Sequence, residues 1–149
     1  NIETITAYNN LDEILKLAKI NLLSSLTVGR VDFGASLNRD RKFSNSKEMY
    51  GYCSEIYKKA KLKNLKTTLG GAVSLESKEF IENLVNENLI ETRKLVYKSS
   101  SIKSIEKGLK KGVEFELLWL KSKRRYYHRI RDEDEKRIEM LEKRLNISK

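Results

Sequence analysis

Hydrophobic and polar residues follow two periods in the first 97 residues of the chain, and the pattern predicts alternating strands and helices. Short apolar runs predict strands at 2–5, 22–28, 67–69 and 89–97. Apolar residues three and four positions apart predict intervening helices, which begin after Asn9 or Asn10, after Ser44 or Ser46, and near Ser74. Strands alternating with helices of this size are typical of an α/β fold with a parallel sheet.

From Ile102 onward the pattern is purely helical. One apolar stripe consists of Ile102, Ile105, Leu109, Val113, Leu117 and Leu120, and a second consists of Phe115, Trp119 and Tyr126. A helix with two apolar faces is either buried on both sides or has two neighbours, one of which could be a partner subunit. The pattern changes near Ile130 and Arg131, and the acidic run 132–135 predicts that a second helix begins there.

Two carboxylates lie at the ends of the first two predicted strands. Glu3 belongs to the first strand, and Asp32 follows the second after about the length of one βα unit. Neighbouring strands lie roughly 5 Å apart, so the two side chains could share one divalent cation, Mg²⁺ or Mn²⁺. The alternative is that Glu3 pairs with Arg30 or Arg93 while Asp32 makes an Asx-turn or caps a short helix.

The segment Gly29–Asp32 is a candidate substrate site, because successive backbone N–H groups at a strand end can hold a carboxylate. Arg30 could add positive charge, although a flexible turn is the simpler interpretation. Gly70 and Gly71 are more typical of a tight turn than of a ligand site. His128 lies in a basic helical stretch, which favours a surface residue over a catalytic base. The sequence contains no Ser/His/Asp triad order and no Cys/His zinc pattern.

Three segments carry a resemblance to a known family: Asn1-Ile2-Glu3-Thr4-Ile5, Gly29-Arg30-Val31-Asp32 and Ile90-Glu91-Thr92-Arg93-Lys94. They resemble the second half of the HpcH/HpaI aldolase and citrate lyase β-subunit family, and the resemblance extends from Asn1 to about Tyr97. It implies that residues 1–100 form the C-terminal half of a (β/α)8 TIM barrel, with four parallel strands and their helices. Residues 101–149 then form a C-terminal helical extension.

The resemblance also implies a metal-dependent carbon–carbon lyase acting on a 2-keto acid or an acyl thioester through a metal-stabilised enolate. It implies that Glu3 and Asp32 bind Mg²⁺ or Mn²⁺, and that Gly29, Arg30, Val31 and Asp32 bind the substrate. The family's catalytic Arg and general base belong to earlier strands, which have no counterpart here. The catalytic residues therefore remain unassigned, and the chain alone is expected to be nearly inactive.

The sequence begins inside a predicted strand, which favours a truncated chain. The 149 residues also fall well short of the roughly 250 that a whole barrel needs. A half-barrel would expose two sheet edges, so we expect it to associate with a missing N-terminal half-barrel or with another copy, forming a homo-oligomer.

The composition narrows the classes of protein to which the chain could belong. The sequence is 39% hydrophobic and 35% charged, and its apolar runs fall short of the roughly 18 residues of a membrane span. The single Cys53 excludes an internal disulfide framework and favours a reducing, cytoplasmic location. Most of the net charge of +10 lies beyond residue 97, without a recognisable nucleic-acid-binding motif. The basic charge is therefore interpreted as a solvated helical face in preference to a nucleic-acid-binding surface. The alternative function is a non-catalytic interaction module that uses these basic helices to bind nucleic acid or a protein partner.

Overall fold

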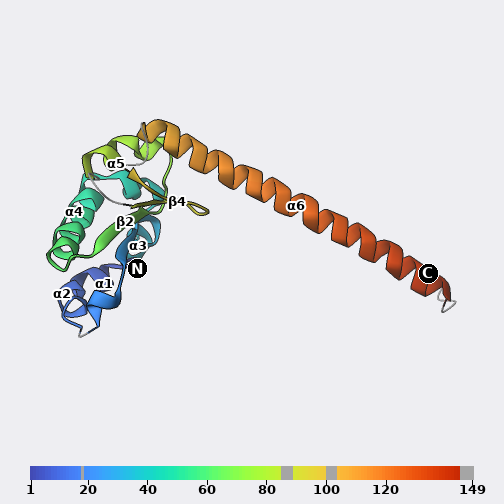
Figure 1. Cartoon of the computed structure of the whole chain (residues 1–149), viewed down its shortest axis with the longest axis horizontal. Coiled ribbons are helices and arrows are strands. Elements are labelled where there is room, and N and C mark those ends of the chain that lie inside the picture. The colour runs from blue at the N-terminus through green and yellow to red at the C-terminus, as the bar shows by residue number, and fades with distance from the viewer. Residues whose placement is uncertain (18, 85–88, 100–103, 145–149) are drawn as a thin grey trace. The chain divides into compact units, whose positions relative to one another are not determined.

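The computed structural model describes residues 1–17, 19–84, 89–99 and 104–144, and its elements are labelled in Figure 1. The chain divides into two compact units, Asn1–Val113 and Glu114–Lys149. Unit 1 is an α/β structure with an open, mixed sheet of four strands in the order β1-β2-β3-β4. The strands are β1 (Ser25–Gly29), β2 (Lys66–Gly70), β3 (Leu89–Glu91) and β4 (Val96–Lys98).

The first predicted strand is reduced to a single residue. Ile2 forms an isolated parallel bridge with Val28 of β1, in which the Ile2 amide donates to the Thr27 carbonyl at 2.7 Å. Helix α1 (Ile5–Asn9) begins immediately afterwards, because the Thr4 side chain caps it by accepting a hydrogen bond from the Ala7 amide. The predicted strand over 2–5 is therefore wrong beyond Ile2, although its predicted neighbour in the sheet was right.

The fourth predicted strand is a hairpin. β3 runs parallel to β2, whereas β4 runs antiparallel to β3. The Thr92 amide donates to the Leu95 carbonyl at 2.8 Å, and the Leu95 amide donates to the Thr92 hydroxyl at 3.1 Å, which closes the turn. Arg93 and Lys94 are exposed at this turn, so the charged middle of the segment marks a reversal of the chain. The prediction of four parallel strands is therefore wrong.

The helices of unit 1 differ from the prediction mainly after β1. The segment expected to be a long loop contains α3 (Arg30–Ser36) and the 3-10 helix η2 (Arg41–Asn45). Ser46, one of the two predicted caps, caps α4 (Lys47–Leu62) by accepting a hydrogen bond from the Met49 amide. The other short elements are α2 (Leu11–Ile14), η1 (Ile20–Leu22), η3 (Leu75–Ser77) and α5 (Lys78–Leu84).

A single hydrophobic core joins the sheet to these helices. Alternate strand residues enter it, among them Leu26, Val28, Leu69 and Ile90. The helices add Phe33, Met49, Cys53, Ile56, Phe80, Ile81 and Leu109. This alternation is the period-two pattern expected of strands, and it leaves the intervening residues for the other face of the sheet.

Helix α6 (Ile105–Arg144) is a single uninterrupted helix of 40 residues (Figure 1). The predicted helix break near Ile130 is therefore wrong. The chain contains no proline, and ion pairs between Arg129 and Glu133 (3.8 Å) and between Arg131 and Glu135 (3.5 Å) lie across the predicted break. Such pairs one helical turn apart favour continuity of the helix.

The first turns of α6 belong to unit 1. Leu109 is fully buried in the core, and Lys78 of α5 forms an ion pair with Glu106 at 3.0 Å. Gly112 allows α6 to pack closely against Thr92 in the turn after β3, because a Cβ atom there would lie 2.9 Å from the Thr92 Cγ2 atom. The predicted start of this helix, Ile102, lies outside the described residues.

Candidate metal and substrate site at the carboxyl edge of the sheet

Four residues lie side by side at the carboxyl ends of the parallel strands: Glu3, Gly29, Gly70 and Glu91, which we call the carboxyl-edge row. The preceding row, formed by Ile2, Val28, Leu69 and Ile90, is 0–3% exposed and faces the core. Successive strand residues point to opposite faces, so the carboxyl-edge row faces the other side of the sheet. Gly29 pairs directly with Gly70, and a carboxylate flanks this glycine pair on each side.

Glu3 approaches the backbone of Gly29 closely. A Cβ atom on Gly29 would lie 2.7 Å from both the Cγ and the Oε1 atoms of Glu3, which is closer than real Cβ atoms come. The half-buried Glu3 carboxylate also accepts a hydrogen bond from the Asn1 side-chain amide at 3.2 Å. The glycine at position 29 thus allows Glu3 to lie over the end of β1.

Asp32 lies in the first turn of α3, which begins directly after β1, and its side chain is exposed. Glu3 therefore lies beside the last residue of β1, and Asp32 lies three residues beyond that residue, in the helix that follows; their binding of a common metal remains a prediction. A carboxylate in the first turn also complements the helix dipole, so Asp32 stabilises α3 with or without a metal. The alternative pairing of Glu3 with Arg30 is not found, because the described partners of Arg30 are all carbonyl oxygens.

Arg30 turns inward and is fully buried. Its guanidinium donates to the backbone carbonyls of Gly70 (3.1 Å), Gly71 (2.6 Å) and Ser44 (3.0 Å), and to the Asn45 side-chain carbonyl at 2.9 Å. The guanidinium also lies 4.7 Å from the centre of the Phe80 ring. Arg30 therefore joins the turn after β2 to the end of η2. No sequence signal predicts this role, because it depends on segments 14 and 40 residues away.

The turn after β2 packs against the start of α3. Gly71 has φ of +76°, and a Cβ atom on it would lie 2.7 Å from the backbone nitrogens of both Arg30 and Val31. Only glycine suits both this conformation and this close approach. The tight turn interpreted from Gly70 and Gly71 is thus present, and it occupies space beside the backbone amides that were expected to receive a substrate carboxylate.

Burial changes the ionisation of two core groups near this edge. Burial lowers the pKa of Arg30 to about 10, so the guanidinium remains charged at neutral pH. Burial raises the pKa of the Cys53 thiol to about 12, and Arg30 lowers it only partly. Because Cys53 is also inaccessible, it has neither the ionisation nor the exposure of a nucleophile.

A groove adjoins the Arg30 network on the side of α4 and α5. It has a volume of about 610 Å³ and is lined by Asn45, Ser46, Lys47, Tyr50, Glu76, Glu79, Phe80 and Asn83. Asn45 and Phe80 contact Arg30, so one wall of the groove is held by this residue. The sequence did not single out this groove, because its walls come from two helices that are distant in the chain.

The ligand set at the carboxyl edge suits a hard cation only in part. Among the described residues, no three or more His, Cys, Asp or Glu side chains come together as a metal site. Glu3 and Asp32 would supply two carboxylates, and water and substrate oxygens would have to complete the shell. Mg²⁺ accepts such an arrangement, because it usually keeps several waters and binds one or two carboxylates.

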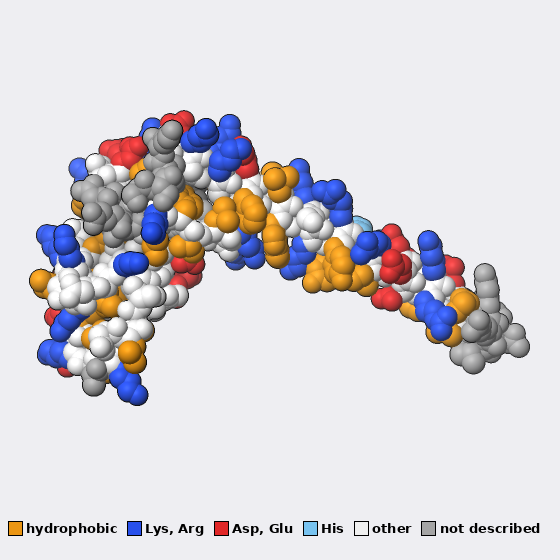
Figure 2. All heavy atoms as spheres, in the orientation of Figure 1, with side chains coloured by type: hydrophobic (Ala, Val, Ile, Leu, Met, Phe, Trp, Pro, Cys, Tyr) orange, Lys and Arg blue, Asp and Glu red, His pale blue; other side chains and the backbone are white. Residues whose placement is uncertain are grey.

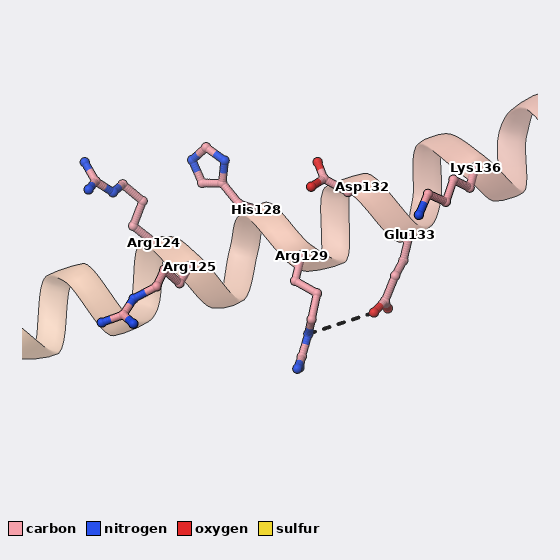
Figure 3. Close-up of a pocket in the computed structure, with 7 residues that line it drawn as sticks. All are labelled: Arg124, Arg125, His128, Arg129, Asp132, Glu133 and Lys136. Atoms are coloured by element: carbon pink, nitrogen blue, oxygen red, sulfur yellow. Dashed lines mark ion pairs between the residues drawn. The ribbon is translucent and has the colours of Figure 1, made fainter.

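Helix α6 carries a second concentration of charge. His128 is exposed there among Arg124, Arg125 and Arg129, as predicted for a surface residue, and Asp132 and Glu133 follow (Figure 3). No residue of the carboxyl-edge row belongs to this helix.

Comparison with protein-family models, with curated proteins and with solved structures finds no match to this chain. In the part of the chain that the structure describes, every helix is too short or too polar to cross a membrane.

Proposed function

We propose that the carboxyl edge of the sheet binds Mg²⁺ or Mn²⁺ together with a 2-keto acid or an acyl thioester, and that the chain belongs to a carbon–carbon lyase. The observation that carries this proposal is the placement of Glu3 over Gly29, at the strand end that leads directly into the helix bearing Asp32. Carboxyl ends of parallel strands are where α/β proteins gather catalytic groups.

Each residue has a distinct role in this proposal. Glu3 and Asp32 hold the cation, which when bound stabilises negative charge developing on a substrate oxygen. Gly29 leaves room for the Glu3 side chain over the end of β1, and Gly70 leaves the next position of the carboxyl-edge row without a side chain, so that a small carboxylic acid can approach the cation there. Arg30 acts as a positioning residue, because its buried guanidinium holds the turn after β2 and the end of η2 beside the start of α3.

The proposal includes completion of the sheet by another polypeptide. Along the outer edge of β1, the described residues provide one bridge, from Ile2. A missing N-terminal half-barrel or a second copy could pair there, which is the arrangement that a C-terminal half-barrel with a helical extension requires. A lyase also needs a base, and the lone histidine, His128, lies on α6 in unit 2. The chain alone should therefore show almost no carbon–carbon cleavage.

Calorimetric titration with Mn²⁺ tests the metal site in the 149-residue chain. Asp32→Asn keeps the size of the side chain and its helix-capping capacity but removes one anionic ligand, so the dissociation constant should rise by about tenfold or more. Asp132→Asn removes an exposed carboxylate from α6 and should leave the affinity unchanged. Equal affinities for the wild type and Asp32→Asn would overturn the metal assignment.

The alternative function is a non-catalytic module that binds through α6. The observation in its favour is the run 121–131, which is exposed except for the partly buried Ile130 and holds six Lys or Arg and no acidic residue. Binding of nucleic acid that weakens steeply with salt and is lost on removal of residues 121–149 would support it. Salt-insensitive or undetectable binding would exclude that role.

A further inference from the structure

The described part of unit 2, residues 114–144, is a helix with an apolar stripe. Figure 2 shows hydrophobic side chains gathered along α6. Along the described part of the stripe the spacing alternates between four and three residues, which is the heptad spacing of a coiled coil. The stripe positions are Val113, Leu117, Leu120, Arg124, Tyr127, Arg131, Asp134, Ile138 and Leu141.

This stripe continues one that is buried in unit 1. Ile105 and Leu109 occupy its first positions, and Leu109 is fully buried. Beyond Val113 the stripe becomes exposed: its five apolar members between Leu117 and Leu141 are 40–56% exposed. Most helical stability comes from packing an apolar face, so a helix this long with an uncovered stripe is expected to have a partner.

We propose that the stripe is covered by the same stripe of a second copy, in an antiparallel coiled coil centred on Arg129. This register superimposes the whole of 114–144 on itself. Leu117 then faces Leu141 of the second copy, and Leu120 faces Ile138. Arg124 faces Asp134, and Tyr127 faces Arg131.

The charges of the helix select this direction. Residues 116–126 carry four Lys or Arg and one Glu, whereas 132–142 carry six Asp or Glu and two Lys or Arg. The antiparallel arrangement places these two segments opposite each other. A parallel arrangement in register would place Arg124 against Arg124 and Asp134 against Asp134, and like charges that face each other are destabilising.

The stripe also selects the register. Sliding one helix by a heptad in one direction places Asp134 against Leu117, and sliding it in the other places Arg124 against Leu141. Either shift buries a charge against an apolar side chain without a partner, which is costly. In the register centred on Arg129, Arg131 keeps its ion pairs with Asp132 and Glu135. Its aliphatic stem and guanidinium can then lie on the ring of Tyr127 of the second copy.

The oligomeric state of the full chain tests the coiled coil. Sedimentation equilibrium of the wild type should show a dimer of the 17.4 kDa chain. Leu120→Lys should shift the dimer towards monomer, because it places an ammonium against Ile138. Leu118→Lys is the matched control: Leu118 is also exposed but lies outside the stripe, so the dimer should persist. A monomeric wild type at about 100 µM, or equal effects of the two variants, would overturn the proposal.

Charge reversal tests the direction and the register. Arg124→Asp places two acidic side chains opposite each other at both ends of the symmetric dimer and should weaken it by about tenfold. Adding Asp134→Arg restores both opposite-charge pairs and should restore the affinity. Arg125→Asp, whose parent side chain projects from another side of α6 than Arg124 (Figure 3), should have a smaller effect than Arg124→Asp. Failure of the double variant to recover, or an equal effect of Arg125→Asp, would refute the pairing. A monomer that binds nucleic acid through α6 would instead assign the helix to that partner.

Discussion

Replacing Arg30 is the most informative perturbation of unit 1, because its side chain joins two loops that meet at the carboxyl edge. Arg30→Met keeps most of the side-chain volume but removes all four hydrogen bonds to Gly70, Gly71, Ser44 and Asn45. We expect the free energy of unfolding of unit 1 to fall.

The magnitude follows from the four acceptors. Hydrogen bonds to a charged group contribute about 1.5–3 kcal/mol each, so the gross loss is roughly 6–12 kcal/mol. Relief from burying a charge offsets part of this, because desolvation of a buried ion costs several kcal/mol. The net loss should be about 3–5 kcal/mol. Arg30→Lys keeps the charge but loses the planar fork of donors, and we expect a loss of about 2–3 kcal/mol.

Urea denaturation followed by near-ultraviolet circular dichroism measures these differences, because tyrosines packed in the core of unit 1 contribute the signal. A loss of 3 kcal/mol in a domain of this size corresponds to a fall of about 10–20 °C in melting temperature. Arg41→Met is the matched control, because Arg41 is exposed in η2 and should cost no more than about 0.5 kcal/mol. A loss below about 1 kcal/mol for Arg30→Met would show that the buried guanidinium makes no net contribution and would refute the reasoning.

Two further predictions concern conformation and ionisation. Gly71→Ala should destabilise unit 1 by about 2 kcal/mol or more, because the residue has positive φ and no space for a Cβ. Gly51→Ala should stabilise α4 by about 0.5–1 kcal/mol, because a Cβ there meets nothing within 4 Å. Melting temperatures of the two variants that shift in the same direction would contradict this. The pKa of Cys53 is raised from 9.0 to about 12, so the thiol contributes stability that is fully present below pH 9 and is lost as pH rises towards 12. Relative to Cys53→Ala, the wild type should lose about 1.4 kcal/mol between pH 8 and pH 10, and parallel pH profiles would show that the folded thiol ionises normally.

Local sequence signals predicted much of unit 1. The alternation of apolar runs predicted an α/β fold, and it correctly placed the segment that contains Ile2 next to the strand that contains Val28. The cap of α4 was narrowed to Ser44 or Ser46, because capping involves only a few consecutive residues, and the structure has Ser46. Glu3 and Asp32 were predicted to approach the same sheet edge, since βα connectivity alone brings consecutive strand ends together.

The errors arose where a local pattern had two physical solutions. The segment 89–98 contains enough β-forming residues for one long strand or for a hairpin, and the exposed charges at Arg93 and Lys94 together with the Thr92 turn selected the hairpin. The acidic run after Arg131 suits a helix start or a helix interior. Ion pairs to Arg129 and Arg131 one turn earlier selected the interior.

What only the tertiary structure decided was the direction of individual side chains at the site. Arg30 follows a strand end and, by sequence, could equally face a substrate or the core. Its direction depends on carbonyls of Ser44, Gly70 and Gly71, which the fold brings around it from distant segments. A sequence pattern specifies which face of an element is apolar, because that depends on neighbours along the chain. The partners of a buried charge depend on loops that meet only after folding.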